Sequence, residues 1–216
     1  MSISENIKRI KSEIPSNVKL VAATKTRTIE EINEAIRAGI TIIGENYVQE
    51  ALKKYEKLNL SNVELHLIGH LQKNKINKAL KIFDCIQSID SYELAEAIDK
   101  RAKKIIPVFI EVNIADEETK FGVKKEYLID LIKKISQLKN IRVEGLMTMP
   151  YFDDPNDARP YFREMKALFE KIRLMNLPNV FMKYLSMGMS NDYKIAIEEG
   201  SNMIRIGTAI FGPRKY

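Results

Sequence analysis

The chain has no tryptophan, a single cysteine and no long apolar stretch. One thiol, Cys85, cannot form an internal disulfide, so a reducing compartment is expected and we predict a cytoplasmic protein. The place of Cys85 beside Phe83 and Ile86 predicts a buried structural thiol rather than a nucleophile. No apolar run approaches the roughly 20 residues required to cross a bilayer, and the N-terminus lacks the basic-then-apolar layout of a signal peptide. We therefore predict no membrane partner.

Charge of one sign is not concentrated anywhere in the sequence. Lys and Arg number 35 and Asp and Glu number 29, which gives a formal net charge of +6. The basic residues are scattered among acidic ones, and no zinc-finger, RNA-recognition or helix-turn-helix signature is present. This pattern predicts solvated helix faces with some attraction for anionic ligands, and no nucleic-acid partner. At 216 residues the chain is long enough for one sizeable core, so we expect a single domain spanning residues 1–216.

Short apolar runs, bounded by polar residues or glycine, recur along the chain and predict strands that are buried on both faces. Nearly all of them are followed by a stretch with helical periodicity. The predicted strands cover residues 18–24, 41–45, 64–69, 85–90, 105–113, 142–149, 183–188 and 203–207.

Helix start and stop signals separate several of these runs. Thr28 and Glu31 form a capping box, and the apolar stripe that follows leads to a stop at Gly39. A longer helix is expected to open near Pro155. Its expected buried face consists of Phe162, Met165, Phe169 and Ile172.

Eight strand-then-helix units in about two hundred residues predict an α/β protein with a single (β/α)8 TIM barrel. The alternative is a doubly wound open sheet, but the first strand is not followed by a Gly-x-Gly-x-x-Gly turn. No obvious helix follows the eighth strand. An N-terminal helix, which repeats isoleucine from Ile3 to Ile14 along one face, is expected to cover that part of the barrel.

Three chemistry-bearing segments fall at the carboxyl ends of predicted strands. Lys25 follows strand one, the Ser-Met-Gly-Met-Ser turn at 186–190 follows strand seven, and the Arg-Ile-Gly-Thr segment at 205–208 ends strand eight. Strands one and eight are neighbours in a closed barrel, and phosphate commonly binds at the loops after strands seven and eight. A lysine that can form an imine is therefore expected beside a glycine-bearing anion cradle. This is the minimum equipment for holding pyridoxal phosphate.

Each residue type in the predicted site has a chemical role. Partial burial would make the free amine of Lys25 available for attack on an aldehyde. Gly188 and Gly207 allow backbone N–H groups to approach an oxyanion, and Ser190 is expected to cap a short helix whose N-terminus attracts phosphate. Arg205, facing the ligand ring, would keep a pyridine nitrogen unprotonated and so predicts weak carbanion stabilisation.

Two alternatives remain open from the residues alone. Arg205 could instead pair with a barrel carboxylate such as Glu45 or Glu111. His66 and His70 bring a metal site to mind, but two histidines without a clear carboxylate partner are a weak metal signature. We therefore predict structural histidines and no metal.

Several segments resemble the pyridoxal phosphate homeostasis protein family (the YggS/PROSC type), which is related to the N-terminal barrel domain of alanine racemase. The resemblance runs from the first strand to the C-terminus. The matching segments are Leu-Val-Ala-Ala-Thr-Lys at 20–25, Gly-Glu-Asn-Tyr-Val-Gln-Glu at 44–50, residues 66–75, 111–113, 120–122 and 145–147, Leu-Ser-Met-Gly-Met-Ser at 185–190 and residues 205–212.

This resemblance implies specific roles in cofactor binding. Lys25 would carry the cofactor as a Schiff base, and Arg205 would face the pyridine nitrogen, with Asn46 close to the ring. The residues implied to hold the phosphate are Ser186, Ser190, Gly207 and Thr208.

The resemblance also implies binding without efficient catalysis. Alanine racemase uses a tyrosine base from a second domain, and only nine residues follow Gly207 here. Tyr216, the last residue, is expected to be a poor substitute because chain ends are usually mobile. We expect a non-catalytic protein that buffers or delivers pyridoxal 5′-phosphate, with apo-enzymes that use this cofactor as candidate partners, and we expect a monomer. The alternative is a single-domain, cofactor-dependent amino-acid racemase of weak activity.

Overall fold

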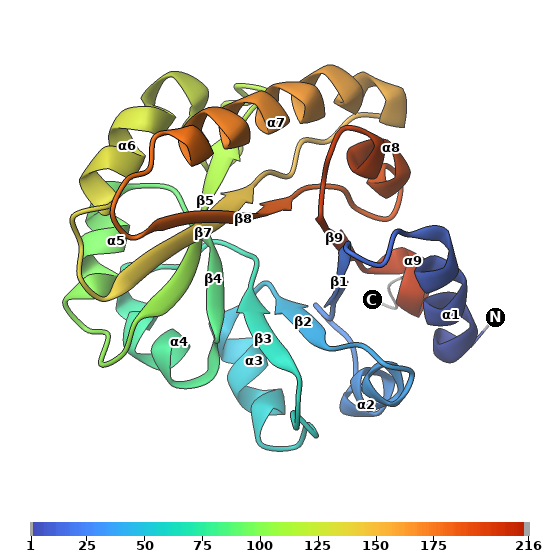
Figure 1. Cartoon of the computed structure of the whole chain (residues 1–216). Helices are drawn as coiled ribbons and strands as arrows, with labels where there is room; N and C mark the ends of the chain where they lie inside the picture. Colours follow the sequence, from blue (N-terminus) through green and yellow to red (C-terminus); the bar gives the residue numbers. More distant parts are fainter. Residues whose placement is uncertain (1, 214–216) are drawn as a thin grey trace.

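Eight parallel strands close into a ring in the computed structural model, which describes residues 2–213. Figure 1 shows the strands at the centre and the helices outside them. The pairing of β4 with β5 completes the ring, so the predicted (β/α)8 barrel is confirmed and the open sheet is excluded. In order around the ring the strands are β1 (Lys19–Ala23), β2 (Ile42–Glu45), β3 (Glu64–Leu67), β4 (Cys85–Ile89), β5 (Ile106–Asn113), β7 (Ile141–Met147), β8 (Val180–Ser186) and β9 (Met203–Ile206).

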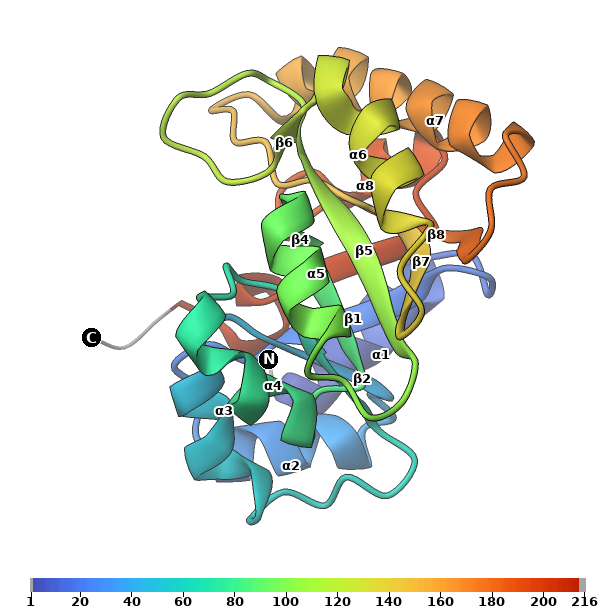
Figure 2. The same ribbon diagram turned by 90° about the vertical axis from the view of Figure 1, so that its left-hand side faces the viewer.

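The predicted strands overlap the observed ones, with one shift and one omission. Strand β8 begins at Val180, before the predicted start at 183, and stops at Ser186. The two-residue strand β6 (Val123–Lys124) was not predicted; it pairs with the end of β5 and lies outside the ring (Figure 2). Two residues are too few to show an alternating pattern.

The helices follow the start and stop signals closely. Thr28 caps α2 and makes the full capping box with Glu31, and Gly39 takes a positive φ of 93° just after the helix ends. The long helix α7 buries the four predicted residues. The helices are α1 (Ile3–Glu13), α2 (Ile29–Arg37), α3 (Val48–Tyr55), α4 (Ile76–Ile82), α5 (Tyr92–Asp99), α6 (Leu128–Ile135), α7 (Arg159–Leu174), α8 (Tyr193–Glu198) and α9 (Thr208–Phe211), with 3-10 turns at Lys73–Lys75, Lys125–Tyr127 and Pro155–Ala158.

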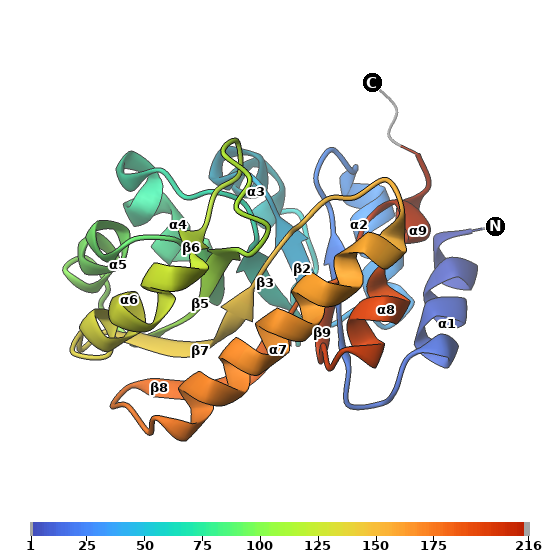
Figure 3. The same cartoon turned by 90° about the horizontal axis from the view of Figure 1, so that it is seen from above.

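Helix α1 covers the barrel next to the eighth strand of the ring, as predicted. Figure 3 shows α1 beside α8 and α9. The Asn6 amide donates to the carbonyl oxygen of Ile210 at 2.9 Å, and the Tyr193 hydroxyl donates to Glu13 at 2.6 Å. The short helix α9 is an addition to the prediction. Tyr216, which was weighed as a catalytic base, lies outside the described residues.

The core has two layers, one inside the ring and one between the ring and the helices. Cys85 belongs to the inner layer, and burial raises the pKa of its thiol well above the usual value, which agrees with a structural role. The inner layer consists of Val21, Ile42, Cys85, Phe109, Met147 and Met203.

No helix among residues 2–213 is both long enough and apolar enough to cross a membrane.

Candidate functional site

A pocket of about 340 Å³ opens at the carboxyl ends of the strands, on the side of the ring where β1 and β9 are neighbours. Its walls combine residues from the two ends of the sequence, as barrel closure requires. Six of the seven predicted site residues line it: Lys25, Asn46, Ser190, Arg205, Gly207 and Thr208.

Lys25 lies just after β1 and is partly buried. Its Nζ lies 3.2 Å from the hydroxyl oxygen of Tyr47 and 4.9 Å from the centre of that ring. The next residue, Thr26, has a positive φ of 66°, and its backbone N–H donates to Glu50 at 2.6 Å. A β-branched residue rarely adopts this conformation, so the contact with Glu50 stabilises the turn that presents Lys25.

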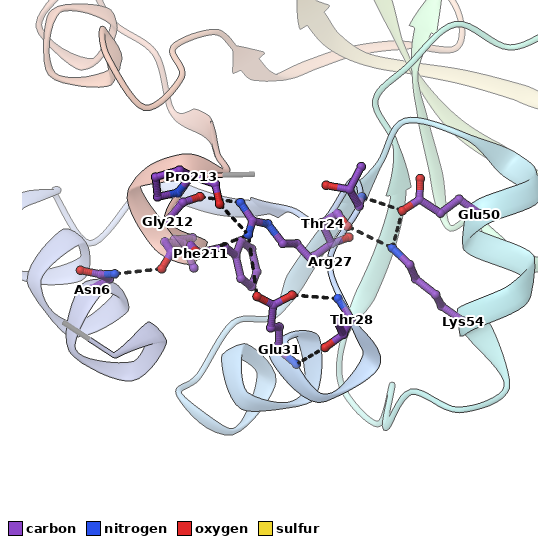
Figure 4. A network of polar contacts seen from close by, with 12 residues as sticks. Asn6, Thr24, Arg27, Thr28, Glu31, Glu50, Lys54, Phe211, Gly212 and Pro213 are labelled. Carbon is purple, nitrogen blue, oxygen red and sulfur yellow. Dashed lines mark hydrogen bonds and ion pairs between the residues drawn. The ribbon is translucent and has the colours of Figure 1, made fainter. Parts of the chain in front are cut away.

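Behind this turn lies a buried charge network that the sequence did not reveal (Figure 4). Lys54 Nζ donates to the Thr24 carbonyl oxygen at 3.0 Å, to Glu50 at 2.7 Å and to Glu45 at 3.1 Å. Burial raises the pKa of Glu45, and the ammonium of Lys54 opposes that shift. The only available signal was the four-residue spacing of Glu50 and Lys54 on one helix, which is common on solvated helices.

Arg205, on β9, is almost completely buried beneath the pocket floor. Its guanidinium donates to the Ser186 hydroxyl and to the Thr148 carbonyl oxygen, both at 2.6 Å. Burial lowers the pKa of Arg205 to about 10, while Glu111 and Asp192 act in the opposite direction. Within residues 2–213 Arg205 forms no ion pair, and its Nε is buried without a hydrogen-bond partner. The alternative of a direct pair with Glu45 or Glu111 is therefore wrong.

Ser186 is the one predicted site residue that does not line the pocket. It is fully buried inside the ring, where it accepts from Arg205 and donates to Gln87 at 2.7 Å. The Gln87 amide lies 2.8 Å from His66 Nδ1, and His66 Nε2 lies 3.0 Å from Glu64. Because an amide nitrogen can only donate, His66 Nδ1 accepts. Ser186 thus belongs to a hydrogen-bonded chain that orients Arg205, and its contact with phosphate stays a prediction.

The predicted anion cradle would lie between the loop after β8 and the start of α9. The prediction that Ser190 caps α8 is wrong, because Asp192 is the residue before that helix; the Ser190 hydroxyl instead accepts from the backbone N–H of Ala209 at 3.2 Å. Gly188 has a positive φ of 97°, and a Cβ there would lie 2.6 Å from the Cβ of Ala196. Glycine at this position therefore lets the loop fold back so that Ser190 reaches the backbone of Ala209 and lines the same pocket as Gly207.

Asn46 lies at the rim of the pocket directly after β2. A Cβ at Gly69 would lie 2.4 Å from the carbonyl oxygen of Asn46, so only glycine allows the loop after β3 to approach this closely. The contact fixes the backbone of Asn46 at the pocket edge.

Comparison with known proteins fits this geometry. The family described as alanine racemase, N-terminal domain, matches residues 1–215. A pyridoxal phosphate homeostasis protein of Aquifex aeolicus is 46% identical over 202 residues, covering 92% of this chain and 88% of that protein. The chain belongs to the alanine racemase N-terminal domain family, within the group of pyridoxal phosphate homeostasis proteins.

Solved structures give the same result for the fold. PipY of Synechococcus elongatus, solved with PLP bound, is 32% identical with a TM-score of 0.90, covering 98% of this chain and 100% of that one. Alanine racemase of Clostridium difficile has a TM-score of 0.82 at 16% identity, and this chain spans 57% of its length. At that identity the likeness to the racemase shows the fold alone.

Arg27 is a pocket residue of this family member that the sequence did not single out. It is buried, and its guanidinium donates to the carbonyl oxygens of Phe211, Gly212 and Pro213 (Figure 4). These hydrogen bonds join the segment before α2 to the end of α9, next to the pocket.

His66 lies on β3 and contacts side chains inside the ring, and His70 follows β3 at the barrel mouth. His70 stacks on Phe121 with 4.0 Å between ring centres, and its Nδ1 lies 3.5 Å from Asp90. Across residues 2–213 no three His, Cys, Asp or Glu side chains are grouped to hold a metal. Both histidines have structural contacts in this family member.

Proposed function

We propose that this protein binds pyridoxal 5′-phosphate at the Lys25 pocket and serves intracellular homeostasis or delivery of that cofactor without efficient catalysis. The observation that carries the proposal is the juxtaposition of a lysine amine, an anion cradle and a buried guanidinium in one pocket. The buried Arg205 Nε has no partner within residues 2–213, and a ring nitrogen is a suitable acceptor. The solved PipY relative, which has PLP bound, supports the same reading.

The site residues have four roles in this proposal. Lys25 supplies the amine for a Schiff base, and Asn46 lies beside the ring. Ser190, Gly207 and Thr208 hold the phosphate. Ser186 keeps the Arg205 guanidinium in place. When bound, the cofactor supplies an aldehyde carbon and an electron-accepting ring.

Arg205 explains why binding need not lead to catalysis. A guanidinium with a pKa of about 10 stays protonated near neutral pH and can only donate. A ring nitrogen that accepts from Arg205 remains unprotonated, which weakens its ability to stabilise a carbanion. The arrangement therefore favours holding the cofactor over activating it.

Three finer features belong to the same proposal. We infer delivery to apo-enzymes that use the cofactor, a monomeric chain and a cytoplasmic location. The formal net charge of +6 suits acidic partner surfaces. Light scattering of the purified protein, with and without cofactor, tests the monomer, and activation of a cofactor-free enzyme by the loaded protein tests delivery.

The deciding experiment is borohydride reduction of the protein loaded with pyridoxal phosphate, followed by mass mapping. One adduct on Lys25 is expected, because Lys25 is the lysine that lines the pocket. The Lys25→Ala variant should lose the adduct and keep weak, phosphate-anchored binding. The matched control is Lys19→Ala, at the far end of β1, which should label like the unmodified protein. Labels spread over many lysines would refute the site, and α-proton exchange of amino acids that depends on Lys25 would establish the racemase alternative.

A further inference from the structure

The amine of Lys25 has a single hydrogen-bond partner within residues 2–213, and that partner is a phenol. Lys25 Nζ donates to the hydroxyl oxygen of Tyr47 at 3.2 Å and lies 4.9 Å from the centre of the ring. Tyr47 directly precedes α3, and its side chain is half exposed. Within the same residues the hydroxyl makes no other hydrogen bond, so its own proton can be donated to a second molecule.

The two carboxylates beside Lys25 are paired with a different lysine. Glu45 accepts from the residue before Lys25 at 2.7 Å, and Glu50 accepts from the residue after it at 2.6 Å. Both carboxylates form ion pairs with Lys54, at 3.1 and 2.7 Å, whereas Lys25 forms none within residues 2–213. A carboxylate next to Nζ would favour the charged ammonium, and only the neutral amine can attack an aldehyde. Lys54 thus neutralises the local carboxylates and leaves Lys25 beside an uncharged partner.

The same contacts fix the separation between Tyr47 and Lys25. Glu50 and Lys54 belong to α3, the helix that Tyr47 precedes. They bond to backbone groups of the residues on either side of Lys25, at 2.6 and 3.0 Å. The hydroxyl and the amine are therefore aligned before any ligand arrives, which lowers the entropic cost of a proton transfer between them.

The other ionisable groups of the pocket have contacts elsewhere. The Asp192 carboxylate accepts from a backbone N–H of its own loop, and the Arg27 guanidinium donates to carbonyl oxygens at the end of α9. Arg205 donates to a hydroxyl and to a carbonyl oxygen beneath the pocket floor. Tyr151 also lines the pocket, but no hydrogen bond joins it to Lys25 within residues 2–213. The phenol before α3 is thus the proton-exchanging group in contact with the amine.

We propose that Tyr47 is the acid–base residue for attaching and releasing the cofactor. Its hydroxyl exchanges protons with Lys25 Nζ while the C=N bond to the cofactor is made and broken. This role rests on the proposed function, because it concerns the loading of the same pocket.

The protons balance in a cycle that leaves Tyr47 unchanged. Lys25, once neutral, gives its lone pair to the aldehyde carbon, and the electrons of the C=O double bond move to the oxygen. The Tyr47 oxygen accepts a proton from Nζ, and the hydroxyl proton passes to the aldehyde oxygen. The second proton of the amine follows the same route, the C–O bond breaks, and the nitrogen lone pair completes the C=N bond. One water leaves, so amine plus aldehyde gives imine plus water, and release is the reverse.

Stopped-flow absorbance of cofactor-free Tyr47→Phe mixed with pyridoxal phosphate tests this role. The substitution keeps the ring beside Lys25 and removes only the hydroxyl. Formation and breakage of the C=N bond should both slow by the same factor, roughly tenfold or more, because an acid–base group lowers one barrier for both directions. The equilibrium affinity should stay the same.

The matched control is Tyr55→Phe, at the last residue of α3, which should load and release the cofactor like the unmodified protein. Unchanged rates for Tyr47→Phe, or a lower affinity with an unchanged rate of formation, would overturn the proposal.

Imidazole in the buffer separates an acid–base role from a structural one. Because Tyr47 is half exposed, a dissolved acid–base pair can reach the amine. Imidazole should accelerate the loading of Tyr47→Phe in proportion to its concentration and leave the unmodified protein nearly unaffected. A slowed variant that imidazole does not accelerate would assign the defect to structure and reject the role of the hydroxyl.

Borohydride reduction with mass mapping distinguishes this proposal from the function on which it rests. Adducts on Lys25 that form at equal rates in the unmodified protein and in Tyr47→Phe would refute the role of Tyr47 alone. The absence of an adduct on Lys25 in the unmodified protein would refute the cofactor site itself.

Discussion

Two glutamates at the mouth of the same barrel are buried in contrasting ways. Glu45 ends β2 on the Lys25 side, and its Oε1 accepts from Thr24 at 2.7 Å and from Lys54 at 3.1 Å. Glu111, near the end of β5, has no hydrogen bond or ion pair of its side chain within residues 2–213, yet only Glu45, through its Oε2, has a fully buried oxygen without a partner. Burial raises the pKa of both carboxyl groups, and Lys54 opposes this effect only for Glu45.

The contrast separates a carboxylate with a cationic partner from one without such a partner. On the Lys25 side Lys54 pairs with Glu45 and Glu50, and Glu50 also accepts from the backbone N–H of Thr26, although Oε2 of Glu45 is buried without a hydrogen-bond partner within residues 2–213. Such a framework keeps the Lys25 side chain in one position. On the β5 side burial is the largest cause of the rise in the pKa of Glu111.

We expect the largest effect on stability when Lys54 is replaced, because Glu45 would then lack a cationic partner, as Glu111 does. Lys54→Met leaves a carboxylate that is 1% exposed without its cation, and we expect a loss of about 3 kcal/mol in the free energy of unfolding at pH 8. Urea denaturation followed by circular dichroism measures it. The control is Lys53→Met, an exposed neighbour on α3, which should change stability by less than about 0.5 kcal/mol. A similar small loss for Lys54→Met would show that Glu45 does not need its partner.

The substitution Glu111→Gln removes the carboxyl group, so that this side chain is neutral at all pH values. A carboxyl whose pKa rises from 4.5 to about 7 on folding binds more protons in the native state than in the unfolded state between those values. The unmodified protein should therefore lose stability relative to Glu111→Gln as the pH rises through this window, by about 3 kcal/mol in total.

Denaturation midpoints from pH 4.5 to 8 measure this difference, which should level off above pH 7. Glu117→Gln, with the same change of charge, should run parallel to the unmodified protein across the range. A flat difference for Glu111→Gln would mean that its carboxyl titrates normally.

The smallest expected effect comes from the hydroxyl that assists Lys54. Thr24→Val keeps the shape of the side chain but removes the donor to Glu45, and we expect a loss of about 1 kcal/mol at pH 8. The exposed Thr41→Val, just before β2, is the control and should be nearly neutral. A loss as large as that of Lys54→Met would mean that the hydroxyl, rather than the charge pair, holds Glu45.

The sequence by itself determined the barrel and the convergence of the site. Apolar runs between polar boundaries locate strands because both faces of a barrel strand are buried. Closure then places Lys25 and Arg205 at one end of neighbouring strands, whatever their distance in sequence. Capping signals such as Thr28 with Glu31 act over one helical turn, so they could be recognised locally.

Only the tertiary structure decided which side chains face the pocket and which are paired. Ser186 and Ser190 lie four residues apart in one turn, yet Ser186 points into the ring toward Gln87 and Ser190 points toward α9. Glu45 ends β2 and Glu111 lies near the end of β5, and the position of Lys54, on helix α3, gives only Glu45 a cationic partner. Side-chain direction and pairing depend on barrel twist and on contacts between distant segments, which no local pattern in the sequence encodes.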